Sequence, residues 1–311
     1  MPNNLHIPKL IAILGPTAVG KSKFAIELAK KVDAQIISAD SMQIYKYFDI
    51  GTSKPTKSER KDVPHHLIDI KNPDQDFNAG LYRKTAIPII NKLNKKNKRI
   101  IIVGGTFLYV KVLLSGLIED VPVDKDLRKN LEKINNEHGT SYLHKKLKKI
   151  DNDSANKINV NDFVRIQRAL EVFYLTGTKI SELQMSHGFN ENEFNVFKVA
   201  LNTDRDNLNN IINDRVNAMI ENGLIEEVKT VRSLGYGKDL KPMKSIGYKE
   251  INQYLDNEID LAGAVELIKR DTRKFAKRQL TWLRGEDELS WYDLKNERDK
   301  LEKDSIKFYG L

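Results

Sequence analysis

Short apolar runs alternate with amphipathic stretches along the first third of the chain. The runs at 10–14, 34–39 and 99–103 have the length and apolar content of buried strands. Apolar residues at helical spacing follow the first run, over 21–31. Strands that alternate with helices in this way predict an α/β fold with a parallel sheet.

Further elements extend this pattern along the chain. A helix is expected at 78–97, with Asn78 as its N-cap and a kink or a break at Pro88. We expect a short strand at 67–70, and at 194–201 a strand that returns to the sheet. The amphipathic helices expected in the last third cover 208–224 and 261–283.

The middle of the chain has a different character. From about 120 to 195 it is polar, rich in Lys and Asn, and helical in pattern, with its strongest helix signal at 163–175. We therefore expect a helical insertion at 120–195 between two parts of an α/β core, 1–119 and 196–311. The second part of the core would carry the basic C-terminal helices.

A glycine-rich motif separates the first expected strand from the first expected helix. It reads GxxxxGK[ST], the pattern of a phosphate-binding loop, and it predicts a P-loop NTPase-like core. The glycines let backbone N–H groups turn inward, the lysine places an ammonium against the outer phosphates, and the serine hydroxyl can hold Mg²⁺. The alternative is a chance turn. The loop residues are Gly15, Pro16, Thr17, Ala18, Val19, Gly20, Lys21 and Ser22.

An acidic residue follows the second expected strand. In open α/β sheets the carboxyl ends of the strands meet at the ligand site, so Asp40 is expected beside the phosphate loop. The strand at 99–103 ends in Gly104-Gly-Thr106, where many phosphate-loop NTPases carry an Asp that helps to hold Mg²⁺. This departure weakens the interpretation as an ordinary ATPase.

Composition narrows the class of protein. The 311 residues include no cysteine, which excludes disulfides, a thiol nucleophile and cysteine-ligated zinc, and which fits a reducing cytosol. No apolar run approaches transmembrane length. The formal net charge of +9 favours an anionic macromolecule as partner, nucleic acid first, although a generally Lys-rich proteome is an alternative explanation.

The helix expected at 261–283 is rich in Lys and Arg. At helical spacing, Arg270, Lys274, Lys277 and Arg278 share a face, with aromatic residues on another. A cationic face beside aromatics suits RNA backbone and bases. The alternative is a solvated helix whose aromatics belong to the core.

At this point several motifs combine into a family pattern. The sequence resembles the tRNA dimethylallyltransferases, in stretches that run in order over nearly the whole chain. The Asp-Ser-Met-Gln and Ala-Lys-Arg-Gln stretches are the most specific. The matching stretches are Gly15–Ser22, Asp40-Ser-Met-Gln-Ile-Tyr45, Pro64-His-His-Leu-Ile-Asp69, Gly104-Gly-Thr-Phe-Leu-Tyr109, Arg165-Ile-Gln-Arg-Ala-Leu-Glu171, Ser245-Ile-Gly-Tyr-Lys-Glu250 and Ala276-Lys-Arg-Gln-Leu-Thr-Trp-Leu-Arg284.

The resemblance implies transfer of a dimethylallyl group from dimethylallyl diphosphate to N6 of an adenosine in tRNA. The acceptor would be the adenosine 3′-adjacent to the anticodon in tRNAs that read codons beginning with U, and diphosphate would be released. Asp40 would be the general base, and Arg215 a second cation on the diphosphate beside Lys21. Without the resemblance, the sequence pattern is also compatible with Arg215 as an exposed surface residue. Thr17 and Thr106 would line the reaction channel.

The same resemblance implies how tRNA and cofactors bind. Ser41, Met42 and Gln43 would contact the target base or its neighbours. The anticodon stem-loop would be gripped by Arg165, Gln167, Arg168, Lys277 and Arg278, and Mg²⁺, held partly by Ser22, would be the cofactor. A monomer in the cytoplasm with no membrane contact is expected.

Two other classes of protein share part of the pattern. A small-molecule or nucleotide kinase would use the same loop and strand-end acid, but it requires ATP and does not explain the basic C-terminal helix. A non-catalytic RNA-binding protein with a vestigial loop is opposed by the intact Lys21, Ser22 and Asp40.

Overall fold

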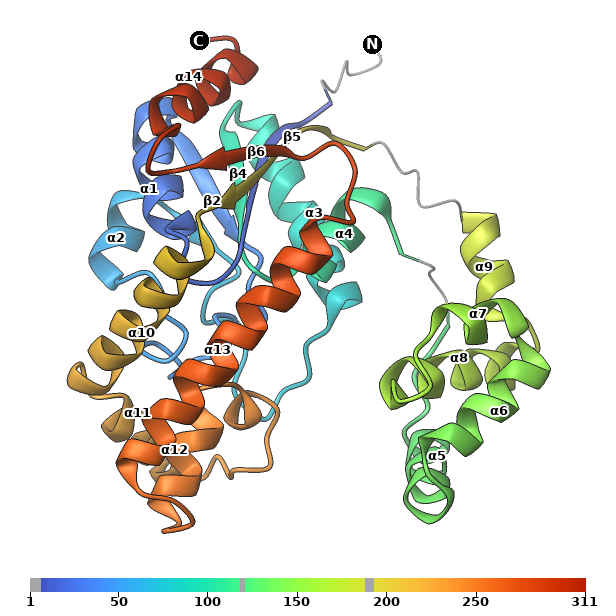
Figure 1. Ribbon diagram of the computed structural model, residues 1–311. Helices are drawn as coiled ribbons and strands as arrows, with labels where there is room; N and C mark the ends of the chain where they lie inside the picture. The colour runs from blue at the N-terminus through green and yellow to red at the C-terminus, as the bar shows by residue number, and fades with distance from the viewer. Residues whose placement is uncertain (1–6, 118–120, 188–192) are drawn as a thin grey trace. The chain divides into compact units, whose positions relative to one another are not determined.

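The computed structural model describes residues 7–117, 121–187 and 193–311 (Figure 1). The chain divides into two compact units, one formed by Met1–Leu114 with Asn192–Leu311 and the other by Ser115–Glu191. The second unit overlaps the helical insertion expected at 120–195, and both of its bounds lie a few residues earlier. Among the residues described, no helix combines the length and the apolar character needed to cross a bilayer.

The first unit is built on a six-stranded sheet in the order β3-β2-β4-β1-β5-β6. Every neighbouring pair is parallel, which confirms the expected α/β fold with a P-loop-like parallel sheet. The strands are β1 Lys9–Leu14, β2 Ala34–Ser38, β3 His65–His66, β4 Arg99–Val103, β5 Asn195–Asn202 and β6 Ser290–Asp293.

Helices cover both faces of this sheet, because successive side chains of a strand point to opposite faces. Leu10 and Ala12 of β1 lie in a core cluster with residues of α3, α4, α11, α12 and α13. Ile11 and Ile13 lie in a second cluster with α1, α10 and α14. These helices are α1 Lys21–Val32, α3 Ala79–Lys95, α4 Phe107–Ser115, α10 Arg205–Glu221, α11 Leu224–Ser233, α12 Tyr248–Leu255, α13 Leu261–Leu283 and α14 Arg298–Tyr309.

Three expected elements differ from the structure. The strand expected at 67–70 is wrong: β3 is His65–His66, and Leu67 and Asp69 have positive φ (62° and 56°), which ends an extended strand. The helix at 78–97 is present as Ala79–Lys95 and continues through Pro88 instead of breaking there.

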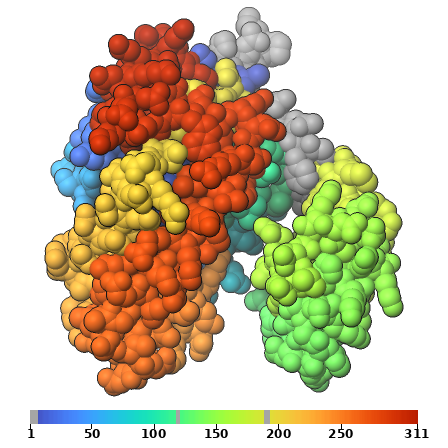
Figure 2. Space-filling view, viewed as in Figure 1, coloured from blue at the N-terminus to red at the C-terminus, as the bar shows by residue number. Residues whose placement is uncertain are grey.

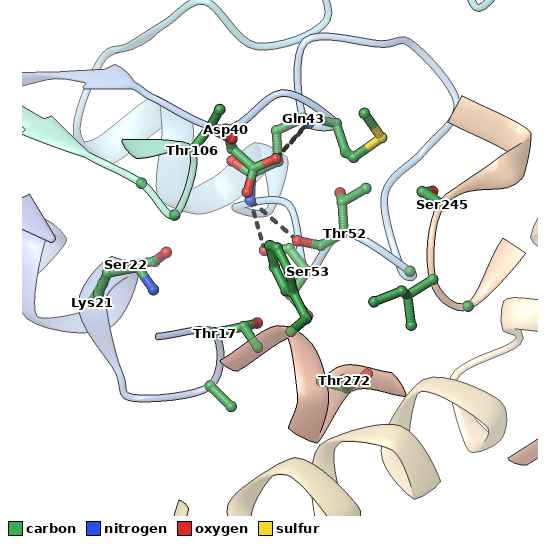
Figure 3. Close-up of a pocket in the computed structure, with 18 of the residues that line it drawn as sticks. Thr17, Lys21, Ser22, Asp40, Gln43, Thr52, Ser53, Thr106, Ser245 and Thr272 are labelled. Atoms are coloured by element: carbon green, nitrogen blue, oxygen red, sulfur yellow. Dashed lines mark hydrogen bonds between the residues drawn. The ribbon is translucent and has the colours of Figure 1, made fainter. Parts of the chain in front are cut away.

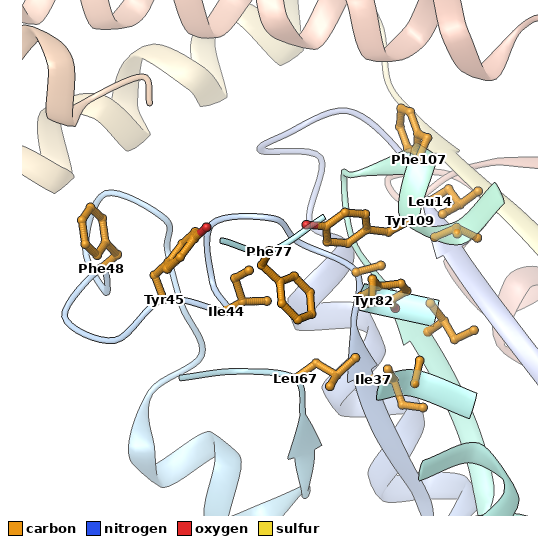
Figure 4. Close-up of a cluster of buried hydrophobic side chains, with 14 of the residues drawn as sticks. Leu14, Ile37, Ile44, Tyr45, Phe48, Leu67, Phe77, Tyr82, Phe107 and Tyr109 are labelled. Atoms are coloured by element: carbon orange, nitrogen blue, oxygen red, sulfur yellow. The ribbon is translucent and has the colours of Figure 1, made fainter. Parts of the chain in front are cut away.

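Burial explains why α3 tolerates the proline. Four of its apolar side chains, Tyr82, Ala86, Ile90 and Leu93, lie in the core, and a buried large apolar side chain contributes roughly 1.5–3 kcal/mol. Figure 4 shows part of this cluster, in which the rings of Tyr82 and Tyr109 stack with centroids 4.5 Å apart. Together these contacts exceed the ~3 kcal/mol that an interior proline costs a helix.

The third difference is the helix expected at 208–224, which is replaced by two helices. Helix α10 begins at Arg205, where the Asp204 side chain caps it by accepting from the N–H of Asn207, and it ends at Glu221. Helix α11 follows after Gly223, whose φ of 96° is a backbone conformation that suits glycine. By contrast, α13 covers the full range expected at 261–283.

The second unit is helical throughout its described part, with its own core of Leu131, Leu143, Leu147, Ile166 and Leu170 among others. Its helices are α5 Lys125–His138, α6 Thr140–Ile150, α7 Asn152–Lys157, α8 Phe163–Thr176 and α9 Ile180–His187. The short helix α2 Lys57–Asp62 and the 3₁₀ turn η1 Pro242–Lys244 complete the first unit.

Candidate active site

The loop between β1 and α1 is shaped by its two glycines. Gly20 has φ 95° and occupies the N-cap position of α1, and Gly15 has φ 153°. A Cβ on Gly15 would lie only 2.8 Å from the carbonyl oxygen of Leu201 on the neighbouring β5. The buried ammonium of Lys21 donates to the carbonyl oxygen of Pro16 at 2.6 Å and so closes the loop. The N-terminus of α1 therefore opens toward a site suited to anions.

A cavity of about 660 Å³ lies beside this loop, within the first unit. Figure 3 shows Thr17, Lys21 and Ser22 on one side of it, with Asp40 and Thr106 above and Thr52, Ser53 and Ser245 opposite. Its walls come from the carboxyl ends of β1, β2 and β4, where parallel strands gather ligands. Further lining residues are Ala18, Gly20, Ser41, Met42, Gln43, Gly104, Gly105, Arg215, Val216, Met219, Ile246, Ile268, Thr272, Phe275, Arg278 and Gln279.

Of the cations that line this cavity, Lys21 and Arg215 are the two whose pKa is lowered by burial. The Arg215 guanidinium donates to the Thr17 hydroxyl at 3.3 Å, so α10 brings Arg215 to the site instead of leaving it on the surface. Burial, and then the charge of Arg215, lower the pKa of Lys21 to about 7, against an opposing effect of Asp40. Burial also lowers the pKa of Arg215. Two desolvated cations side by side favour the binding of an anion with more than one charge.

Asp40 stands where β2 ends and is fixed by its own turn. Its Oδ1 accepts from the backbone N–H groups of Met42 (2.8 Å) and Gln43 (3.2 Å). Its Oδ2 accepts no hydrogen bond from the described residues. The Thr106 hydroxyl accepts from the N–H of Ser41 at 2.9 Å and thereby ties this turn to the end of β4. One carboxylate oxygen is thus held in place and the other is available to a ligand in the cavity.

Gln43 lies in the same turn, but its amide is engaged within the protein. Its Nε2 donates to the carbonyl oxygens of Thr52 (3.2 Å) and Ser53 (3.4 Å), and its Oε1 accepts from the Ser38 hydroxyl. The side chain is 8% exposed. The structure therefore uses Gln43 to join the Asp40 turn to the loop at 49–53, where the resemblance implied contact with a base.

That loop is fixed by a residue that the sequence did not single out. The Glu227 carboxylate of α11 accepts from the backbone N–H groups of Asp49, Ile50 and Gly51, at 2.7–3.2 Å. The buried Tyr248 donates its hydroxyl to Glu227. Tyr248 belongs to the Ser245–Glu250 stretch of the family pattern, so the sequence did mark one partner of Glu227. No pattern within the sequence connects Glu227 to residues 49–51.

The unusual Gly-Gly-Thr ending of β4 has a steric cause. A Cβ on Gly104 would lie 2.1 Å from the carbonyl oxygen of Ala39, because the ends of β2 and β4 meet there. The N–H of Thr106 donates to the same carbonyl at 3.1 Å. The close approach of two backbones at this edge excludes an aspartate at position 104.

Helix α13 carries the expected cationic face, and only some of its charges are available. Arg270 pairs with Asp271, Lys269 with Glu266, and Arg273 donates to Asn213. Lys277 and Arg278 are exposed and form no ion pair within the described residues. The guanidinium of Arg278 lies 5.8 Å from the ring centroid of Phe275, and both line the cavity. In Figure 2 the orange atoms of α12 and α13 form a broad surface of the first unit.

The three residues expected to bind tRNA in the second unit have different surroundings. Arg165 is largely exposed and pairs with Asp162 at 2.8 Å. Gln167 is 8% exposed and donates to the carbonyl oxygen of Arg128. Arg168 donates to the fully buried Glu171 and to the carbonyl oxygens of Val121 and Pro122. Gln167 and Arg168 thus contact other parts of the unit, and Arg165 is the most exposed of the three. Their assignment to tRNA stays a prediction.

The residues at the loop fit a magnesium ion that is shared with a phosphate ligand. The Ser22 hydroxyl lines the cavity beside the phosphate loop, and an oxygen ligand of this kind is one that Mg²⁺ prefers. No group of three His, Cys, Asp or Glu residues in the described ranges could hold a metal by itself. A bound Mg²⁺ would therefore take further ligands from phosphate oxygens and water.

Fold and cavity together define a phosphate-loop α/β protein whose ligand site lies at the carboxyl edge of the sheet. Residues 43–286 match the model of the IPP transferase family. The chain is 45% identical over 306 residues to the tRNA dimethylallyltransferase of Thermoanaerobacter sp. (strain X514), covering 96% of this chain and 97% of the relative. It is 47% identical to that of Alkaliphilus oremlandii, covering 93% and 92%. The chain belongs to the IPP transferase family.

Solved structures agree with this assignment. The full-length tRNA isopentenylpyrophosphate transferase of Bacillus halodurans superposes with a TM-score of 0.71 at 38% identity, covering 97% of both chains. A eukaryotic dimethylallyltransferase, described as acting on tRNA, superposes with a TM-score of 0.80 at 27% identity, covering 96% of this chain and 78% of the other.

Proposed function

We propose that the protein transfers the dimethylallyl group of dimethylallyl diphosphate to N6 of the adenosine 3′-adjacent to the anticodon, in tRNAs that read codons beginning with U. Diphosphate is released. The observation that carries this proposal is one cavity that contains a phosphate loop, the two desolvated cations Lys21 and Arg215, and the Asp40 carboxylate. The membership of the family supports the same reaction.

On the donor side, the loop binds the group that leaves. Cleavage of the allylic C–O bond moves negative charge onto the diphosphate, which takes the bonding electron pair. Inward backbone N–H groups, Lys21 and Arg215 stabilise this charge where it develops. A Mg²⁺ held in part by Ser22 supplies further neutralisation of the diphosphate when it is bound.

On the acceptor side, Asp40 receives the proton that the adenine amine loses as the new N–C bond forms. Asp40 lines the cavity, and its Oδ1 is fixed by the N–H groups of Met42 and Gln43, which leaves Oδ2 to accept the proton. The target base must leave its stack to enter the cavity. Thr17, beside Arg215, and Thr106, beside the Asp40 turn, line the route on which donor and base meet.

The tRNA is held mainly by phosphate contacts. Lys277 and Arg278 on α13, and Arg165 on α8, are the exposed cations assigned to this role, with Phe275 available for stacking. Binding through such contacts weakens as salt is raised. We propose that the protein acts as a monomer. Since the acceptor is tRNA, we infer a cytoplasmic location.

A two-donor assay tests the proposal. Purified protein, Mg²⁺ and unmodified tRNA that reads codons beginning with U are incubated with dimethylallyl diphosphate or with ATP, and the digested nucleosides are weighed by mass spectrometry. We expect a gain of one dimethylallyl group on one adenosine, with the prenyl donor alone. ATP consumption without such a gain would contradict the proposal and favour a kinase, and tRNA binding without turnover would favour a binding protein.

A further inference from the structure

A single buried amide joins the phosphate loop to the loop after β4. The Oε1 of Gln279, on α13, accepts from the backbone N–H of Thr17 at 2.8 Å. Its Nε2 donates to the carbonyl oxygen of Gly105 at 2.9 Å. The side chain is 4% exposed, so water does not compete freely for either bond. Gln279 has no place in the chemistry described above.

Because Gly105 has no side chain, the amide of Gln279 can occupy the space beside it. A Cβ at position 105 would lie 2.5 Å from Nε2 of Gln279, which is closer than real Cβ contacts allow. Apart from the two residues next to Gly105 in the chain, no other described residue has an atom within 4 Å of this Cβ position. The φ of Gly105 is not positive, so its backbone would accept an alanine. The requirement for glycine here comes from Gln279 alone.

The two loops joined by Gln279 hold the two halves of the proposed reaction. The phosphate loop carries Thr17, whose hydroxyl accepts from Arg215, and it leads to Lys21. The loop at Gly105 continues to Thr106, whose hydroxyl holds the N–H of Ser41 next to the Asp40 carboxylate. The Gln279 side chain therefore joins the loop that binds the diphosphate to the loop that orients Asp40, the proposed general base.

The two contacts need a side chain that accepts at one atom and donates at another, which an amide does at every pH. Thr17 offers a donor and Gly105 offers an acceptor, so the side chain must present an oxygen to the first and an N–H to the second. The reverse orientation of the amide would face N–H with N–H and oxygen with oxygen. A carboxylate lacks the donor, whereas a protonated carboxylic acid could accept from Thr17 and donate to Gly105.

We propose that Gln279 is a positioning residue that sets the separation between the diphosphate-binding loop and the loop that orients Asp40. The inference rests on the proposed function, because the two loops act on different substrates of that reaction. Misplacement of reacting groups by about 1 Å can lower a rate about 100-fold. Loss of the bridge therefore lowers kcat by about 10- to 100-fold.

A double-mutant cycle tests the bridge. The variants are Gln279→Ala, Gly105→Ala and the two combined, with kcat and KM for dimethylallyl diphosphate measured on tRNA and normalised to active sites. Each single change is expected to lower kcat. Gly105→Ala is expected to have little further effect when Gln279 is already alanine, since its Cβ then has space. Additive losses, or a kcat near wild type in Gln279→Ala, would overturn the proposal.

Matched controls separate positioning from general instability. Gly237→Ala places a Cβ in open space, and Gln253→Ala removes a half-buried glutamine from α12. Both are expected to keep wild-type kcat, and thermal unfolding reports the stability of every variant. A loss explained wholly by unfolding, with kcat per active site unchanged, would mean that Gln279 is structural only.

A carboxyl in place of the amide gives an independent measurement, because its protonation changes with pH. In Gln279→Glu, the introduced carboxyl restores both hydrogen bonds only when it is protonated. The ratio of its kcat to that of wild type is therefore expected to rise as the pH falls from about 8 to about 6, since burial raises the pKa of a carboxyl. A ratio that does not change with pH would contradict the hydrogen-bonded bridge.

Failure of the proposed function is recognised separately. If wild type does not prenylate tRNA, that function is wrong, and the same cycle is measured on the affinity for inorganic diphosphate by calorimetry. Non-additive weakening would then support a bridge that shapes the phosphate loop, and equal affinities in all variants would overturn it.

Discussion

The buried ammonium of Lys21 makes the stability of the free protein depend on pH. Its pKa is lowered from 10.5 to about 7, chiefly by burial and then by the charge of Arg215. In the unfolded chain Lys21 keeps its proton up to about pH 10.5, so the unfolded state binds more protons between about pH 7 and 10.5. The free energy of unfolding therefore rises with pH across this window, and below about pH 7 the full cost of the buried charge is present.

The size of the effect follows from the pKa. A change from 10.5 to about 7 corresponds to roughly 5 kcal/mol, at about 1.4 kcal/mol per pKa unit. Between pH 7 and pH 9 the wild-type free energy of unfolding should gain about 2 kcal/mol from this residue alone. Lys21→Met keeps the aliphatic length and removes the charge, so this gain should be absent. The lost hydrogen bond to Pro16, worth about 1 kcal/mol, lowers stability equally at every pH.

Urea denaturation of wild type and Lys21→Met, without ligand, at several pH values from about 6 to about 9 measures the difference directly. All other titrating groups are common to the two proteins and cancel. The free energy of unfolding of Lys21→Met, minus that of wild type, is expected to be greatest at the lowest pH. The variant is also expected to lose the use of the diphosphate donor at every pH. Parallel curves of stability against pH would refute a desolvated Lys21.

Three further changes have separate expected results. Asp40→Asn should lower single-turnover prenylation by about 10²- to 10⁴-fold and leave tRNA affinity in filter binding unchanged; near-normal turnover would remove Asp40 as base. Lys277→Ala should weaken tRNA binding and lower the slope of log K against log salt by about 1; an unchanged slope would exclude a phosphate contact. Glu171→Ala leaves Arg128 and Arg168 without their buried partner and should destabilise the second unit by about 2–4 kcal/mol in urea; unchanged stability would show that these pairs contribute nothing.

The structure shows contacts within the protein for several residues that the resemblance assigned to tRNA. Gln167 and Arg168 belong to a stretch of the family pattern, but their side chains fasten α8 within the second unit. Gln43 lies in the most specific stretch, and its amide joins two loops of the protein. These contacts give each residue a structural role, and its assignment to tRNA stays a prediction.

The sequence by itself determined the secondary-structure elements and the glycine-rich loop. Short apolar runs between helical stretches, and the glycine spacing of 15–22, depend on neighbours in the chain, so the parallel sheet, the phosphate loop and α13 could be predicted. The position of Asp40 also followed, because parallel strands place their carboxyl ends at one edge.

Contacts between distant segments were decided only in three dimensions. Arg215 meets Thr17 across 198 positions, Gln279 meets Thr17 across 262, and Glu227 reaches the loop at 49–51 across 176 or more. None of these pairs shares a spacing that marks one face of a helix or strand. They form because the sheet brings its strand ends to one edge, and because a buried polar group costs free energy unless it finds a partner.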